Sequence, residues 1–87
     1  MEKIRLIGIR GDQNYEFWRR NINQVLQELN MQNSLEEINN INSILDLKVS
    51  AIPALIINDT ILLEQNNHIP DIQEFKDSIL DYLNQGL

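Results

Sequence analysis

The sequence predicts an α/β domain whose elements follow one another in the order β-α-β-α-β-β-α. Three observations support this prediction. A short apolar run at residues 4–9 is typical of a largely buried strand. A stripe of apolar residues at helical spacing follows it. Two leucine-rich or β-branched runs, at residues 54–57 and 60–63, are separated by only two residues. The 87 residues are enough for one domain, which we place over residues 1–87.

The first strand and the first helix have the clearest patterns. Residues 10–14 interrupt the apolar run and predict a loop. From Tyr15 the period changes to that of a helix of about four turns. Its apolar stripe contains Trp18, Ile22, Val25, Leu26 and Leu29. Asp12 or Asn14 can cap the start of this helix, and Asn30 can end it.

The middle of the chain has weaker patterns. Leu35 and Ile38 lie among polar residues and predict a short strand, while residues 41–47 suggest one to two helical turns. Residues 49–53 are predicted to be extended, because a residue before a proline avoids the α region.

A hairpin and a last helix complete the predicted domain. Asn58-Asp59 forms a two-residue turn, so the strands on either side of it must be antiparallel. Asp71 and Glu74 are spaced as a capping box at the start of the last helix, and Gly86 follows its end. The first two strands must form a right-handed parallel crossover through the first helix.

Composition excludes several function classes. A net charge of −6 makes nucleic acids and anionic membranes poor partners. No apolar run is long enough to span a membrane, and the chain has no cysteine. We therefore expect a cytoplasmic protein. A single histidine, His68, makes neither a catalytic triad nor a metal site, and the sequence has no phosphate-binding or dinucleotide motif. We expect no metal and no cofactor.

The segment Val49-Ser50-Ala51-Ile52-Pro53-Ala54-Leu55 resembles the V-x-S/A-x-P-A-L segment of the small thioredoxin/glutaredoxin-like group of prokaryotic redox proteins. The order of the predicted elements is also similar to the thioredoxin fold. The resemblance implies a four-stranded mixed sheet in the order 2-1-3-4, with three helices on its faces. It also implies a cis-proline at Pro53.

The sequence departs from that group at the active site. Aligning the first helices without a gap places Asp12-Gln13-Asn14-Tyr15 on the group's C-x-x-C motif, with Asp12 and Tyr15 at the two cysteine positions. The positive end of a helix stabilises a thiolate and would equally favour the Asp12 carboxylate. A carboxylate cannot form a mixed disulfide, so the chain cannot perform thiol–disulfide chemistry.

These observations lead to a redox-inactive module that binds a protein or a peptide. The implied candidate surface consists of Gly11, Asp12, Gln13, Asn14, Tyr15, Ile52 and Pro53. In the group that this chain resembles, the residue before the proline offers backbone hydrogen bonds to a peptide or to glutathione, and Ile52 retains those groups. We assign no catalytic residue, because an aspartate at the position of Asp12 is usually a helix cap and Tyr15 could either contact a ligand or pack within the helix.

Two other functions remain open. One is a binder of a glutathione-like small molecule, or a minor non-redox enzyme, that uses the same groove. The other is a homo-oligomeric structural protein, with a homodimer as its simplest form.

Overall fold

The computed structural model describes residues 2–31, 34–66 and 68–85, and its elements follow the predicted order. The elements are β1 (Ile4–Ile7), α1 (Gln13–Glu28), β2 (Leu35–Ile38), α2 (Ile41–Asp46), β3 (Ala54–Ile57), β4 (Thr60–Glu64) and α3 (Ile72–Asn84). Gly86, predicted to follow the last helix, lies outside the described residues.

The four strands form one mixed sheet in the order β2-β1-β3-β4, as predicted. β1 pairs with β2 in a parallel arrangement that places Ile7 opposite Ile38. On its other side, β1 pairs with β3 in an antiparallel arrangement that places Ile7 opposite Ala54. β3 and β4 form the antiparallel hairpin predicted from Asn58-Asp59.

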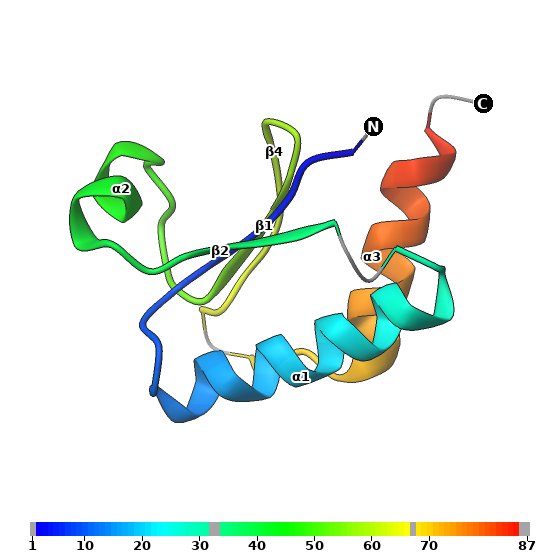
Figure 1. Cartoon of the computed structure of the whole chain (residues 1–87), viewed down its shortest axis with the longest axis horizontal. Helices are drawn as coiled ribbons and strands as arrows, with labels where there is room; N and C mark the ends of the chain where they lie inside the picture. The colour runs from blue at the N-terminus through cyan, green and yellow to red at the C-terminus, as the bar shows by residue number, and fades with distance from the viewer. Residues whose placement is uncertain (1, 32–33, 67, 86–87) are drawn as a thin grey trace.

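Figure 1 shows α1 along the bottom, α3 at the right and α2 at the upper left. Residues of α1 and α3 pack in one core cluster with Leu6 and Leu55 of the sheet, whereas Ile44 of α2 packs in another with Ile7 and Ile56. The sheet is therefore the middle layer, with two helices on one face and a short helix on the other.

Polar side chains cap the N-termini of α1 and α3. Asp12 is the N-cap of α1, where its carboxylate accepts a hydrogen bond from the backbone N–H of Tyr15 (3.1 Å). The helix therefore begins at Gln13, two residues before the predicted start, because Asp12, Gln13 and Asn14 are polar and do not belong to the apolar stripe. Asp71 and Glu74 form the predicted capping box of α3.

β1 ends at Ile7, although the apolar run continues to Ile9. The backbone N–H of Gly8 still donates to the Ile38 carbonyl (3.1 Å), but the Ile9 carbonyl accepts from the Asp12 N–H in a turn (3.1 Å). Ile9 therefore belongs to the loop, and its side chain is 39% exposed.

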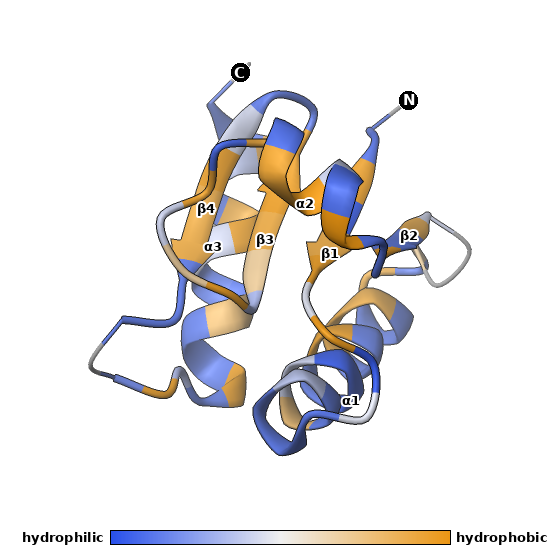
Figure 2. Cartoon of the chain, turned by 90° about the vertical axis from the view of Figure 1, so that its left-hand side faces the viewer, coloured by the Kyte–Doolittle hydropathy of each residue, from blue (hydrophilic) through white to orange (hydrophobic). Residues whose placement is uncertain are grey.

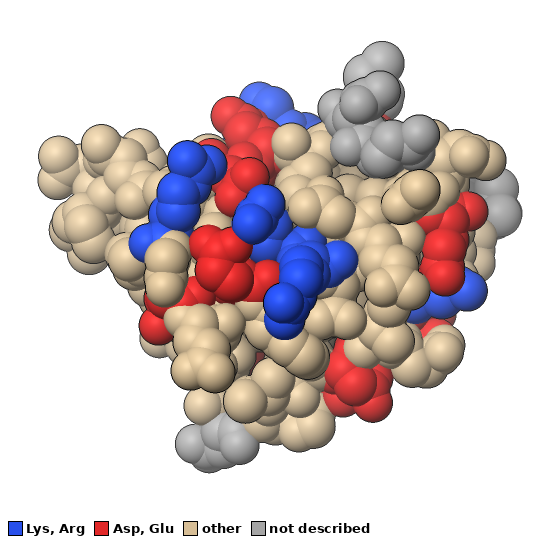
Figure 3. All heavy atoms as spheres, turned by 60° about the horizontal axis from the view of Figure 1, so that its bottom comes forward, with Lys and Arg blue, Asp and Glu red and all other residues tan. Residues whose placement is uncertain are grey.

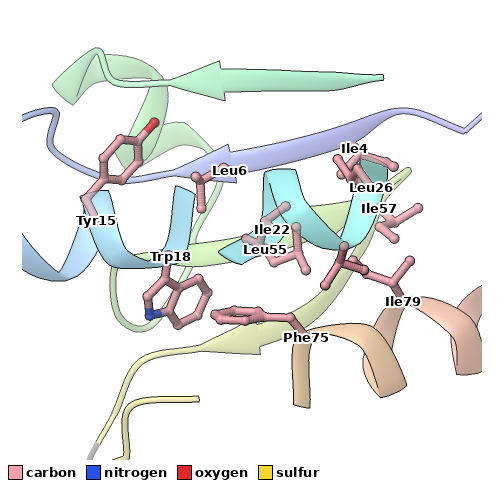
Figure 4. Packing of buried hydrophobic residues seen from close by; sticks show 11 residues of the cluster. Ile4, Leu6, Tyr15, Trp18, Ile22, Leu26, Leu55, Ile57, Phe75 and Ile79 are labelled. Carbon is pink, nitrogen blue, oxygen red and sulfur yellow. The ribbon is translucent and has the colours of Figure 1, made fainter. Parts of the chain in front are cut away.

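The main core lies between the sheet and the two helices α1 and α3. Figure 4 shows the indole of Trp18 against the ring of Phe75, below Leu6 and Leu55 of the sheet. The two ring centroids lie 5.0 Å apart at 71°, which is the favourable edge-to-face arrangement. A smaller cluster under α2 consists of Ile7, Ile44, Ala54 and Ile56.

Within the part of the chain that the structure describes, no helix is both long enough and apolar enough to cross a membrane.

Candidate functional site

The residues of the candidate surface meet at one end of the sheet. Because Ile7 lies opposite Ala54, the chain leaves β1 where it enters β3. Figure 1 shows these two segments at the left of the molecule, above the start of α1, and Figure 2 looks directly onto them. Residues that are about 40 positions apart in the sequence therefore share this end of the molecule.

The loop before α1 supplies the exposed part of this surface. Gly11, Asp12 and Gln13 are exposed, and Asn14 is half-buried. Gly11 has a φ of +92°, a conformation that favours glycine. Asp12 caps α1 through its contact with Tyr15, so its carboxylate has a structural partner of its own.

Tyr15 is fully buried, so its side chain lies beneath the surface. Its hydroxyl donates to Glu37 Oε1 (2.6 Å) and accepts from Asn39 Nδ2 (2.9 Å). The same Asn39 nitrogen donates to the Gly8 carbonyl (3.0 Å). At the position that the alignment equates with the second cysteine, the chain has a partly buried polar network that connects the first helix to the end of β2.

Gly8 makes room for this ring. A Cβ atom built on Gly8 would overlap Cδ1 of Tyr15. The close approach explains why a glycine interrupts the first apolar run, since any side chain there would displace the tyrosine.

The Ile52–Pro53 segment forms the other half of the surface. The peptide bond between these residues is cis, Pro53 is buried, and the Ile52 side chain is 36% exposed. Neither the N–H nor the C=O of Ile52 forms a hydrogen bond with another of the described residues. This backbone therefore has a free donor and a free acceptor at an exposed position.

Gln65, just after β4, holds this segment against the core. Its backbone N–H donates to the Pro53 carbonyl (3.0 Å), and its side-chain Oε1 accepts from the indole Nε1 of Trp18 (2.8 Å). A single residue thus links α1, the proline segment and the end of the hairpin.

Charged side chains around the start of α1 are paired with one another. Glu16 binds Arg19 (2.7 Å) and accepts from the Gly11 N–H (3.1 Å), and these contacts lower the pKa of the Glu16 carboxyl, the Arg19 hydrogen bond first. The same contact with Glu16 raises the pKa of Arg19. Figure 3, seen from the α1 side, shows basic and acidic groups interleaved on this face. This face therefore has no large patch of a single charge sign.

Tyr15 provides a pH test of this partly buried network. Burial first, and the hydrogen bond to Glu37 second, raise the pKa of Tyr15 from 10.0 to about 12. The pKa of Tyr15 is higher in the folded protein than in the unfolded chain. The contribution of the neutral phenol to the free energy of unfolding is therefore complete below pH 10 and is lost as the pH rises through about 12. We expect urea unfolding to show this loss between pH 10 and 12, and the Tyr15→Phe variant to show a smaller one. Equal losses of unfolding free energy in the two proteins would contradict the hydrogen bond between the Tyr15 hydroxyl and Glu37.

At this end of the sheet, the described residues present an exposed loop and backbone groups rather than a cluster of metal-ligating side chains. No three side chains of His, Cys, Asp or Glu gather at a metal-binding distance in residues 2–31, 34–66 and 68–85. The carboxylates of Asp12, Glu16 and Glu37 all have internal partners. The features that remain available are an exposed loop, an aliphatic side chain and a free backbone.

Sequence reasoning missed Glu37, Asn39 and Gln65. A strand glutamate, a loop asparagine and a loop glutamine have no local pattern that points to a shared site. Gly8 did offer a signal, because an isolated glycine within a strand pattern marks a close approach.

The comparison with protein families agrees with the architecture. The family model described as a thioredoxin domain matches residues 14–77, which is more than half of the chain and includes both Tyr15 and Pro53. No curated protein matches the sequence.

Proposed function

The chain belongs to the thioredoxin domain family, and on that premise we propose that it is a binding module that recognises a protein or a peptide through the candidate surface. Without cysteine the chain cannot perform thiol–disulfide exchange. The rest of the fold is intact, including the sheet order and the proline segment next to the first helix. The domain thus keeps the fold around the proline segment but lacks the cysteines that the redox reaction of the family needs.

The observation that supports binding most directly is the free backbone of Ile52. An exposed donor and acceptor on one residue can pair with an extended peptide in the way that adjacent strands pair. Gln65 fixes the carbonyl of Pro53, so the segment is held in place before a partner arrives. A pre-positioned segment loses little conformational entropy on binding, which favours affinity.

The surface is less suited to a glutathione-like anion. An anion at the start of α1 would meet the carboxylate of Asp12 and the carboxylate of Glu16, which already occupy the positive end of the helix. We therefore favour a peptide or protein segment over a small anionic ligand.

Capture of partners by matched surface variants tests the proposal. The immobilised domain is exposed to a lysate of its source cells, and bound proteins are identified by mass spectrometry. We expect Ile52→Asp to lose partners that the unmodified domain retains, because a carboxylate desolvated against an apolar contact is costly. Ile41→Asp on α2, at a residue 57% exposed, serves as the matched control and should retain them.

Melting temperatures of the two variants establish that both are folded. Partners lost by Ile41→Asp but kept by Ile52→Asp would place the binding surface on α2 and contradict the proposal. A captured set dominated by the chain itself would instead favour the homo-oligomer, which gel filtration then measures.

A further inference from the structure

The face of the sheet that carries α2 is only partly covered. Ile44 of α2 packs on Ile7, Ala54 and Ile56, whereas α1 and α3 pack on the opposite face. α2 has only six residues, and Figure 1 shows it at the upper left, toward the side on which β1 leads into α1. Among the described residues, α2 is the only helix on this face, so the part of the sheet beyond it has no helical cover.

One row of residues crosses the sheet at the edge of this cover. Strand register places Arg5 opposite Glu36 of β2 and opposite Ile56 of β3, and Ile56 lies opposite Ile61 of β4. Residues directly opposite one another share a face, so the row lies on the α2 side, where Ile61 is 41% exposed. Lys3 precedes Arg5 by two positions and therefore lies on the same side. We call Lys3, Arg5, Glu36 and Ile61 the open patch.

Arg5 is the least satisfied polar group of the open patch. Its Nε lies 3.6 Å from Glu36 Oε1, too far for a hydrogen bond, and this buried atom has no hydrogen-bond partner among the described residues. Lys3 and Arg5 face the carboxylate of Glu36, with Asp59 in the hairpin turn, and Glu64, one row further on, is held by a backbone N–H. The region is thus close to neutral on a chain whose net charge is −6. A carboxylate brought to Arg5 would supply the acceptor that its guanidinium lacks.

α2 carries an aliphatic stripe that its own sheet does not cover. Ile44 faces the sheet, but Ile41 and Leu45, which lie one helical turn apart, are 57% and 70% exposed. They are the two most exposed large hydrophobic side chains among the described residues. Asp46 is the only charged residue of the helix. The helix therefore offers two aliphatic side chains and one carboxylate to a surface outside its own sheet.

We propose that two copies of the chain associate through this face, with α2 of each copy lying on the open patch of the other. Ile41 and Leu45 of one copy then contact Ile61 of the other, and Asp46 reaches Arg5 of the other copy. Because the stripe and the open patch lie on one face of one molecule, each copy supplies both halves of the contact, as a two-fold interface requires. The two short helices together form the layer that one of them is too short to provide.

The distribution of charge favours this face for self-association. α3 packs on the opposite face, and its residues and cap carry four carboxylates and one lysine: Asp71, Glu74, Asp77, Asp81 and Lys76. Two copies that meet through their α2 faces hold these acidic helices on the outside, where salt screens their repulsion. Each copy contributes only three exposed aliphatic side chains, so the interface is small and the dimer is expected to dissociate on dilution.

Sedimentation equilibrium from micromolar to millimolar concentration measures this association. We expect the average mass to rise from that of one chain toward that of two. Leu45→Asp should raise the dissociation constant at least about tenfold, the effect of losing a buried leucine contact. Ile69→Asp is the matched control: it adds the same charge at an isoleucine that is 53% exposed, but this residue lies just before α3. Its dissociation constant should be that of the unmodified chain.

Asp46→Lys tests the charged part of the contact. The substitution reduces the net negative charge of the chain, so general repulsion between copies falls. We nevertheless expect weaker association at low salt, because the new lysine would meet Arg5 of the other copy, and we expect high salt to diminish the difference. Association that Asp46→Lys leaves unchanged or strengthens would overturn the contact between Asp46 and Arg5.

A spin label on α2 tests where the helix lies. Because the chain has no cysteine, Ser43→Cys provides a single attachment site at an exposed position of α2. Labelled protein without ¹⁵N is mixed with ¹⁵N-labelled protein that carries no spin label, so only contacts between copies broaden amide signals. We expect broadening at Arg5, Glu36 and Ile61. The same label at Asp77→Cys, on the exposed side of α3, should not broaden these signals.

Several outcomes would overturn the inference. A mass that stays at one chain up to millimolar concentration would do so, and so would a Leu45→Asp variant that associates as well as Ile69→Asp. Broadening confined to α2 would show that the helices meet each other and not the open patch. Melting curves establish that the variants are folded. The contact does not use Ile52 or Pro53, so Leu45→Asp and the capture control Ile41→Asp should both be monomers that still retain captured partners.

Discussion

Replacing Trp18 by alanine is expected to lower the free energy of unfolding by about 3–5 kcal/mol. Trp18 is fully buried, packs edge-to-face on Phe75 and donates its indole N–H to Gln65. The substitution would leave a cavity between α1 and α3 and an unpaired side-chain oxygen on Gln65. For a domain whose total stability is on the order of 5–15 kcal/mol, this loss brings the protein close to unfolding.

Urea unfolding followed by circular dichroism measures this effect. Trp18→Phe, which retains an aromatic ring against Phe75 but removes the N–H donor, should lose a smaller part of the stability. Ile41→Ala, at an exposed position, should change stability by less than about 1 kcal/mol. A Trp18→Ala variant as stable as Ile41→Ala would mean that the indole is not the centre of the core.

Replacing Gly8 by alanine is expected to destabilise the domain by about 1–3 kcal/mol through overpacking. The new methyl group would overlap the ring of Tyr15. The ring cannot swing away freely, because its hydroxyl is bound to both Glu37 and Asn39. The clash must therefore break the hydrogen bonds of the Tyr15 hydroxyl or move the first turn of α1.

A double-mutant cycle isolates this contact. In a Tyr15→Leu background the ring and its hydroxyl are absent, so the added cost of Gly8→Ala should fall well below its cost in the unmodified protein. The four proteins are compared by urea unfolding under the same conditions. Additive losses would show that alanine at this position acts through the backbone and not through the tyrosine.

The two effects bear on function in different ways. Trp18 supports the candidate surface from below, through Gln65 and the Pro53 carbonyl. Gly8 and Tyr15 instead fix the loop that leads from β1 into α1. A milder variant at either position should therefore alter partner binding before it unfolds the protein, which the capture experiment can measure on Trp18→Phe.

Local patterns were sufficient for the elements and their order. The apolar stripe of Trp18, Ile22, Val25 and Leu26 defined the face of α1 that the structure buries. Asn58-Asp59 placed the hairpin, and Asp71 with Glu74 placed the start of α3, because turns and caps depend on residues within a few positions of one another. The predicted strand at Leu35 and Ile38 also formed, at the edge of the sheet.

The sequence by itself determined that this chain has a thioredoxin-like architecture and that thiol chemistry is impossible, since element order and the absence of cysteine are properties of the chain alone. Only the tertiary structure decided which residues make the site. Tyr15 is bound to Glu37 and Asn39, and Gln65 joins Trp18 to Pro53, across separations of 22 to 47 residues in the bonds between side chains. Strand pairing brings these residues together, and no local sequence periodicity predicts contacts between residues so far apart in the chain. Ile9 illustrates the same limit: it continues the apolar pattern of a buried strand, yet the turn between Ile9 and Asp12 ends β1 early and leaves the Ile9 side chain exposed.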